Sequence, residues 1–241
     1  MNTAIPGFDR YWLEVRGASL DTPSEVEAII SLARLEPGSK VFDAGCGPGR
    51  IANALAKEGM DVLGVDLSEE LIAIAQSDPS GAQYLIGDYL DTPLPADEYR
   101  FGQFDAVLSW HTSWGYDHHE RNLAFFPRCM SLLRPGGKLV LQTWNPLGMP
   151  EQMSNIFRTH DGALICEVLD FNPENLVVSL DRAYWNLEGR AGNRQKAHCQ
   201  TYTYRDINAW LRGCGFDPVK AVAIPLDHPW QLIVATKEAV Q

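Results

Sequence analysis

The sequence predicts an α/β fold built on a doubly wound, mostly parallel β-sheet. Short β-rich segments alternate with helical patterns through the first 145 residues. This alternation is typical of βαβ units, whose strands run parallel. A glycine-rich segment directly follows the first of these strands, and later segments complete a sheet of seven strands. Sheets of this kind bind their ligands outside the carboxyl ends of the strands.

A capping sequence marks the start of the first helix. Thr22, Pro23 and Glu25 fit an N-cap, a first helical position and the glutamate of a capping box. The strands expected next are Lys40–Ala44, Asp61–Val65, Gln83–Ile86, Asp105–Ser109 and Lys138–Thr143, with helices near Arg50–Lys57, from Ser68 onward, and at Glu120–Leu133.

The pattern changes after Asn145. Three segments, Ala163–Asp170, Leu176–Trp185 and Lys196–Tyr204, predict two consecutive hairpins, which form an inserted antiparallel β flap. A helix near Arg205–Arg212 and strands near Val219–Ile224 and Gln231–Thr236 then return to the main sheet. We therefore expect a single domain over 1–241, divided into an N-terminal cap with the first helix (1–37), a ligand-binding core (38–145), the flap (146–204) and a C-terminal part (205–241).

Composition narrows the class of partner. The net charge of −11 disfavours binding along a nucleic-acid backbone, so a small molecule or a peptide is the expected partner. No apolar run reaches the length of a membrane span, and the first residues do not resemble a secretory signal. The five cysteines form no C-x-x-C pair, which favours a reducing cytoplasm. The oligomeric state is not predicted.

Three alternating glycines form the clearest motif. Gly45, Gly47 and Gly49 follow a strand and precede a helix, where glycine permits a tight turn and close approach of backbone N–H groups to a ligand. A dinucleotide-binding G-x-G-x-x-G motif requires a small residue at position 50. The chain has Arg50 there, so a dinucleotide is disfavoured.

Two acidic residues follow the next two strands. Asp66 ends the second strand about twenty residues after the glycines, where a carboxylate can accept hydrogen bonds from both hydroxyls of a ribose. Asp88 and Tyr89 follow the third strand, where the carboxylate can accept a bond from an adenine amino group. A turn stabilised by Asp88 is the alternative interpretation.

Together these segments resemble class I, Rossmann-like S-adenosylmethionine-dependent methyltransferases. The resemblance covers about residues 38–145 and rests on Val41–Gly49, Gly64–Ser68, Gly87–Tyr89, Phe104–Ser109 and Leu133–Leu139. It implies that S-adenosylmethionine is the cofactor. The cofactor-binding residues that it implies are Asp43, Gly45, Cys46 and Gly47 at the methionine end, Asp66 on the ribose, Leu67, Asp88 and Tyr89 at the adenine, and the backbone of Ser109 and Trp110 at the amino group.

The segment Thr112–Tyr116 resembles a Thr-Ser-Phe-Gly-Tyr sequence found in one branch that acts on small molecules, with Trp114 in place of Phe. In that branch a segment before the first helix folds over the cofactor, which makes Tyr11 a candidate cofactor-binding residue; an ordinary surface position is the alternative.

Residues expected to line the substrate pocket are Trp114, Tyr116, Trp144, Asn145 and Tyr184. Aromatic faces attract a sulfonium or a protonated amine, although they also serve as packing surface. His111 is the candidate general base.

A metal site is not predicted. Asp117, His118, His119 and Glu120 are metal-ligating types, but Asp117 and Glu120 also fit a capping box, and adjacent histidines at a helix start diverge.

Three functions fit these features. The leading hypothesis is in-line methyl transfer to a small metabolite or an amino-acid-like substrate. In the first alternative the cofactor is itself the substrate and closes a ring with release of methylthioadenosine, as in azetidine-2-carboxylate synthases, which resemble methyltransferases. In the second alternative the chain is a catalytically silent regulatory subunit that binds S-adenosylmethionine.

Overall fold

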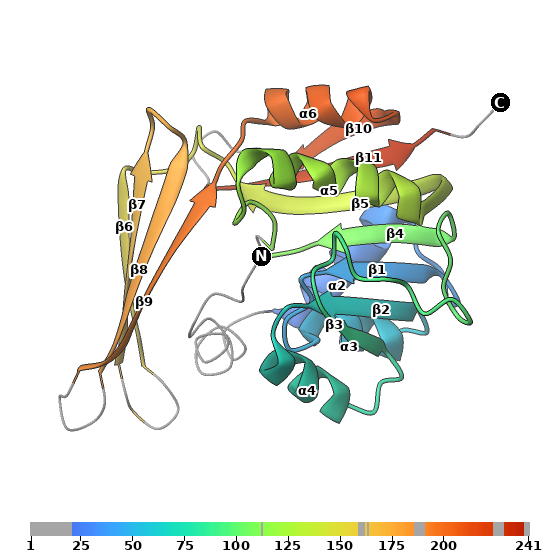
Figure 1. Cartoon of the computed structure of the whole chain (residues 1–241), viewed down its shortest axis with the longest axis horizontal. Helices are drawn as coiled ribbons and strands as arrows, with labels where there is room; N and C mark the ends of the chain where they lie inside the picture. The colour runs from blue at the N-terminus through green and yellow to red at the C-terminus, as the bar shows by residue number, and fades with distance from the viewer. Residues whose placement is uncertain are drawn as a thin grey trace.

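The computed structural model describes residues 21–111, 113–158, 162, 164–185, 191–223 and 229–238. Two sheets dominate them (Figure 1). The main sheet contains β1 (Lys40–Ala44), β2 (Asp61–Asp66), β3 (Gln83–Ile86), β4 (Phe104–Ser109), β5 (Leu133–Trp144), β10 (Phe216–Ala223) and β11 (Trp230–Lys237). Its strand order is β10-β11-β5-β4-β1-β2-β3. Only β11 runs antiparallel to the other strands of this sheet, so the predicted mostly parallel, seven-stranded sheet is confirmed.

Helices cover both faces of this sheet because successive strand residues point to opposite sides. Val41 packs with α2 (Thr22–Ala33), α3 (Arg50–Lys57) and α4 (Glu69–Ser77). Its neighbour Phe42 packs on the other face with α5 (His119–Leu132) and α6 (Tyr204–Gly213). Strand order reverses between β1 and β4, which both end at the same edge of the sheet. Ligands of doubly wound sheets bind at such a switch point.

Two predicted capping boxes are wrong. Asp21, not Thr22, caps α2, and its carboxylate accepts the N–H of Ser24. His118, not Asp117, caps α5, and its ring accepts the N–H of Arg121. In both cases an acidic residue of the expected capping box pairs with an arginine: Glu25 with Arg50, and Asp117 with Arg121.

The flap is a separate antiparallel sheet of four strands, one more than the sequence pattern indicates (Figure 1). It consists of β6 (Gln152–Arg158), β7 (Leu164–Asn172), β8 (Val177–Trp185) and β9 (Ala191–Gln200). The edge strand β6 is mostly polar and alternates between exposed and half-buried residues, so its hydrophobic signal is weak. Its pairing with β7 over seven residue pairs identifies it as a strand.

Trp114 is part of the hydrophobic core. Its side chain is 0% exposed, and its indole N–H donates to the carbonyl of Asn122 at 2.8 Å. Its ring packs against Phe126 and Tyr202, at centroid distances of 5.3 and 5.0 Å. The expectation that Trp114 lines the substrate pocket is therefore corrected: the aromatic side chains of α5 and its surroundings enclose it.

We predict that Trp114→Ala lowers the free energy of unfolding by about 3–5 kcal/mol, because it leaves a large cavity in the core. Urea unfolding measures the change. Trp185→Ala is the control: this side chain is 39% exposed at the end of β8, and its loss changes stability by less than about 0.5 kcal/mol. Equal effects of the two substitutions contradict the assignment of Trp114 to the core.

Candidate cofactor and active site

The glycine loop lies between β1 and α3 at the switch point. Gly45, Gly47 and Gly49 all have left-handed φ values, of 75°, 54° and 77°. A Cβ on Gly45 would lie 2.4 Å from the Cβ of Ser113, whereas one on Gly47 would have no neighbour closer than 3.9 Å. The loop is thus packed against the segment that follows β4 at Gly45 and open at Gly47. The open side leaves room for a ligand against the backbone.

Asp66 holds this loop in place. One carboxylate oxygen accepts the N–H of Gly47 at 2.8 Å, and the other accepts the N–H of Ser68 at 3.0 Å. Ser68 in turn caps α4 with its hydroxyl, which accepts the N–H of Leu71. The glycine loop and the β2–α4 turn therefore form one hydrogen-bonded unit.

A second carboxyl group lies buried beside Asp66. Burial of Asp43, together with the negative charge of Asp66 and against the opposing charge of Arg50, raises the pKa of Asp43 to about 7. The neighbouring side chains of Asp43 and Asp66 favour a ligand that brings positive charge or hydrogen-bond donors, because such a ligand offsets the repulsion between the two carboxylates. S-adenosylmethionine carries a sulfonium, an ammonium and two ribose hydroxyls, so these residues fit it.

Asp88 follows β3, at the same edge of the sheet. One oxygen of its carboxylate accepts the N–H of Leu90 at 2.9 Å, and the other lies 2.5 Å from the guanidinium of Arg121. The ring of Tyr89 packs edge-on against Phe125, with centroids 5.4 Å apart. Burial raises the pKa of Tyr89 well above its usual range, so its hydroxyl stays neutral. Both the predicted ligand contact and the turn-stabilising role remain compatible with Asp88.

Glu25, on α2, contacts Arg50 at the beginning of α3, and nothing in the sequence indicates this contact. Its carboxylate pairs with Arg50 and lies 2.8 Å from Nε2 of His111. Burial alone would raise the pKa of Glu25, but hydrogen bonds from His111 and Arg50 outweigh it and lower that pKa to about 2. Glu25 is therefore ionised at neutral pH. The only available signal, its place in the capping pattern, pointed to a different contact.

His111 has a constrained backbone directly after β4. Its φ of 53° is in the left-handed region, which a non-glycine residue adopts at an energetic cost. Its N–H donates to the side chain of Gln142 on β5 at 2.9 Å. Its ring nitrogen Nε2 also lies 2.5 Å from the guanidinium of Arg50. These contacts fix the imidazole beside the glycine loop.

The other predicted cofactor residues lie around the same edge. Ser109 ends β4, and its hydroxyl is 2.8 Å from that of Ser113. Trp110 is buried beneath α2 and α3. Leu67 follows β2 and is half-buried. Burial raises the pKa of the Cys46 thiol, so only its backbone is a reasonable ligand contact. Tyr11 lies outside the described residues.

The expected pocket residues fall into two groups. Trp144 ends β5 and stacks on Trp230, with centroids 4.0 Å apart, while Asn145 follows it and Tyr116 packs against the same cluster. Tyr184 lies near the end of β8 and packs against Ile165. The structure thus brings Trp144, Asn145 and Tyr116 together at the carboxyl end of β5, and places Tyr184 on the flap.

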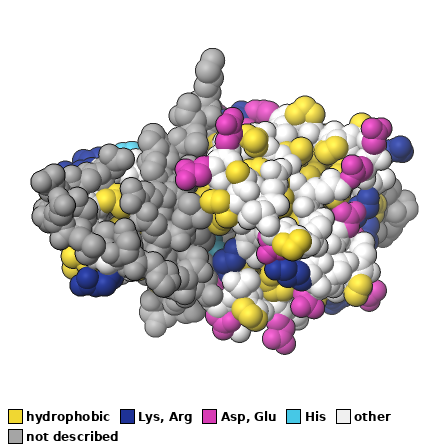
Figure 2. Space-filling view, turned by 90° about the horizontal axis from the view of Figure 1, so that it is seen from below, with side chains coloured by type: hydrophobic (Ala, Val, Ile, Leu, Met, Phe, Trp, Pro, Cys, Tyr) yellow, Lys and Arg dark blue, Asp and Glu magenta, His cyan; other side chains and the backbone are white. Residues whose placement is uncertain are grey.

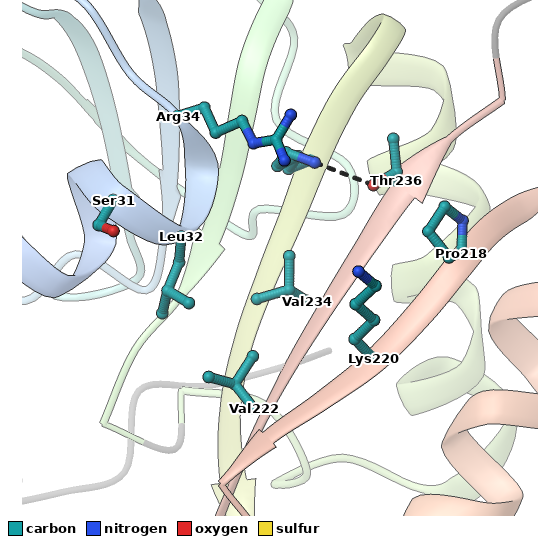
Figure 3. Close-up of a pocket in the computed structure, with 9 residues that line it drawn as sticks. Ser31, Leu32, Arg34, Pro218, Lys220, Val222, Val234 and Thr236 are labelled. Carbon is teal, nitrogen blue, oxygen red and sulfur yellow. Dashed lines mark hydrogen bonds between the residues drawn. The ribbon is translucent and has the colours of Figure 1, made fainter.

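A separate cavity of about 430 Å³ lies at the other end of β5 (Figure 3). Arg34, Lys138 and Lys220 contribute positive charge to it, and Lys138 donates to the hydroxyl of Thr236 at 3.1 Å. Lys138 lies in the first half of β5, whereas parallel α/β sheets bind ligands at the carboxyl ends. This cavity is therefore not the cofactor site. Among the residues that the structure describes, no group of three or more His, Cys, Asp and Glu side chains gathers to hold a metal ion.

Comparison with known proteins defines the class. A family model described as a methyltransferase domain matches residues 41–137. A ubiquinone biosynthesis O-methyltransferase of Xanthomonas axonopodis pv. citri is 40% identical over 118 residues, 47% of this chain and 46% of that protein. A putative methyltransferase of Geobacillus is 28% identical over 190 residues, 76% of each chain. The match thus spans about half the length of the ubiquinone relative.

Solved structures extend the likeness to the flap. The CcbJ methyltransferase of Streptomyces caelestis has a TM-score of 0.77 at 20% identity and covers 96% of both chains. CalS10 of Micromonospora echinaspora, an amino pentose methyltransferase with S-adenosylmethionine bound, has a TM-score of 0.76 at 20% identity and covers 98% of this chain and 99% of that one. At this identity the likeness establishes the fold.

The switch-point loop and its two carboxylates define a nucleotide-type ligand site on a doubly wound sheet. Residues 41–137 match a methyltransferase domain, and the chain shares its overall fold with the methyltransferases of the two solved structures.

We predict that stability of the ligand-free protein falls between about pH 4 and pH 7 because of Asp43. With a folded pKa of about 7, Asp43 keeps its proton in the folded state over this range and loses it in the unfolded state. The unfolded state then binds fewer protons, so the free energy of unfolding decreases by up to ~1.4 kcal/mol per pH unit. Asp43→Asn removes this contribution. Urea unfolding at several pH values measures how the free energy of unfolding changes with pH in the wild type and in Asp43→Asn. The same pH dependence in both proteins contradicts the raised pKa of Asp43.

Proposed function

We propose that this protein transfers the methyl group of S-adenosylmethionine to a nitrogen, oxygen or carbon atom of a small molecule. The observation that carries the proposal is the glycine loop held by Asp66 beside the buried Asp43, within residues that match a methyltransferase domain. Similar proteins are named for O-methylation in ubiquinone biosynthesis, for methylation of an amino pentose and, in KedS8, for N-methylation of a sugar. The sulfonium of the bound cofactor supplies an already activated methyl group, so alignment and exclusion of water are the enzyme's main tasks.

The contacts of the loop support specific roles for its residues. We assign the backbone of Gly45–Gly47 and Asp43 to the methionine end, and Asp66 to the ribose. Leu67, Asp88 and Tyr89 are assigned to the adenine, and the carbonyls of Ser109 and Trp110 to the amino group. Tyr11 is proposed to fold over the cofactor.

His111 is the side chain that we propose to react with the acceptor. We assign it as the base that takes a proton from the acceptor, with Glu25 as a positioning residue. The ionised carboxylate of Glu25 beside Nε2 stabilises the positive charge that the imidazole gains. Arg50 opposes this charge, and its own contact with Glu25 keeps the carboxylate in place.

Around the acceptor, the stacked pair Trp144 and Trp230, with Tyr116 and Asn145, supports a largely apolar pocket wall. Such a wall excludes water and attracts a cationic acceptor or sulfonium through its ring faces. The acidic and basic side chains of the described surface in Figure 2 are scattered and do not form one large basic patch. No helix in the described part of the chain is both long and apolar enough to cross a membrane.

A product assay tests the reaction. We predict that S-adenosylhomocysteine accumulates only when an acceptor is present, in a panel that includes amines, phenols and amino sugars. Release of methylthioadenosine without any acceptor contradicts methyl transfer and establishes the ring-closing alternative. Tight cofactor binding without any product across the panel favours the silent-subunit alternative. No observation on the described residues favours either alternative.

We predict that His111→Ala lowers kcat by about 10²- to 10⁴-fold, the usual contribution of a positioned general base. The dissociation constant for S-adenosylmethionine, measured by calorimetry, changes little, because the loop contacts remain. His198→Ala is the matched control, since His198 lies on the exposed side of β9, and it leaves kcat unchanged. An unchanged kcat in His111→Ala removes His111 from the role of base.

A further inference from the structure

One face of the flap is turned toward the mouth of the active site. Six of its residues belong to the hydrophobic cluster that contains Trp144: Leu169, Phe171, Val178, Leu180, Ala197 and Cys199. We call them the inner face, together with the residues at alternate positions on the same strands. Trp144 ends β5, at the sheet edge that holds the cofactor loop. Figure 1 shows the flap standing beside this edge. The apolar part of the inner face packs with Trp144, Tyr116 and Trp230 at this edge of the main sheet.

The strand register continues this face beyond the apolar contacts. Leu169 pairs with Leu180, and two residues further along the same strands Glu167 pairs with Arg182. Asn155 pairs with Glu167 on one side, and Gln195 pairs with Arg182 on the other. Since side chains two residues apart point to the same face, these four form one row across four strands, about 7 Å beyond the apolar row. We call Asn155, Glu167, Arg182 and Gln195 the polar row.

The members of the polar row bind one another. Nε of Arg182 donates to Glu167 at 2.6 Å, a terminal guanidinium nitrogen donates to Oε1 of Gln195 at 3.2 Å, and Asn155 donates to Glu167 at 3.3 Å. Glu167, Arg182 and Gln195 are 1%, 5% and 4% exposed. The charges of Arg182 and Glu167 cancel, so the row is neutral overall although it is buried.

One donor in this row has no protein partner. The amide nitrogen Nε2 of Gln195 is buried without a hydrogen bond, while its Oε1 is engaged by Arg182. Buried polar groups in proteins are almost always paired, so an unpaired one on the face that continues from the Trp144 cluster indicates a place for a ligand acceptor. Apolar side chains lie on both sides, with Leu169 and Leu180 in one flanking row and Ile165 and Tyr184 in the other.

We propose that the polar row binds a neutral, hydroxyl-bearing part of the acceptor, an inference that rests on the proposed methyl transfer. A hydroxyl accepts from Nε2 of Gln195 and can donate to an oxygen of Glu167, whereas a second carboxylate would lie against Glu167. Apolar rows on either side suit the flat, less polar faces of a ring. The acceptor is thus a hydroxylated ring compound, and Gln195 determines the preference for its hydroxyl.

Gln195→Met tests this assignment, since methionine has a similar volume and no donor. The probes are glucosamine, an amino sugar, and cyclohexylamine, which has a six-membered ring and an amine but no hydroxyl. In the wild-type protein we expect kcat/KM for glucosamine to exceed that for cyclohexylamine by at least about tenfold, the effect of one good hydrogen bond. In Gln195→Met this ratio falls toward one, through KM for glucosamine. Lys196→Met, on the exposed side of the same strand, is the control and keeps the ratio.

The outcomes separate this proposal from the proposed function. Turnover of both amines with an unchanged ratio in Gln195→Met upholds methyl transfer and overturns the role of the polar row. If neither amine is methylated, calorimetric titration of glucosamine into the protein saturated with S-adenosylhomocysteine decides: binding that Gln195→Met weakens supports the row, and absence of binding overturns it. Because the ratio compares two substrates of one protein, a general loss of folded protein does not imitate the result. Melting temperatures of both variants, expected within a few degrees of the wild type, verify this.

Discussion

The carboxylate of Asp66 is the contact on which the site depends. It accepts N–H groups from Gly47 and Ser68, and so joins the loop after β1 to the turn after β2. Without it, the amide of Gly47 would lose the bond that fixes it, since the amides of Gly45 and Gly49 donate to backbone carbonyls instead. Its charge also raises the pKa of the neighbouring Asp43 after the larger effect of burial. The same two carboxylates that make the empty loop electrostatically unfavourable make it favourable for a ligand with a sulfonium, an ammonium and hydroxyl donors.

The flap, where we propose that the acceptor binds, differs in construction from the glycine loop, where we propose that the cofactor binds. The cofactor loop consists of backbone and short side chains on a rigid sheet, which suits a ligand of fixed structure. Over it stands a second, antiparallel sheet whose inner face carries apolar rows and one buried polar row. The two solved structures cover both sheets at 20% identity, so they share this arrangement of a main sheet and a flap.

Much of the main sheet could be predicted because its signals are local. The strand Lys40–Ala44, the helix Arg50–Lys57 and the strand Gln83–Ile86 have the bounds that hydrophobic pattern and glycine placement indicate. The contacts of Glu25 could not be predicted, since they join residues that are far apart in the chain. Trp114 was misassigned for the same reason: a tryptophan after a strand suits a pocket or a core equally, and only the packing of α5 and Tyr202 decides. The edge strand β6 is too polar to identify from its own sequence.

The number of protons released when S-adenosylmethionine binds tests most directly whether the cofactor binds beside Asp43. If S-adenosylmethionine binds beside Asp43 and favours its ionised form, binding must release the proton that this carboxyl holds in the free protein. Calorimetric titration of the cofactor at pH 6 in buffers of different ionisation enthalpy gives the number released. We expect close to one proton released per cofactor for the wild type and none from this site in Asp43→Asn. Binding with the same proton balance in both proteins would contradict it.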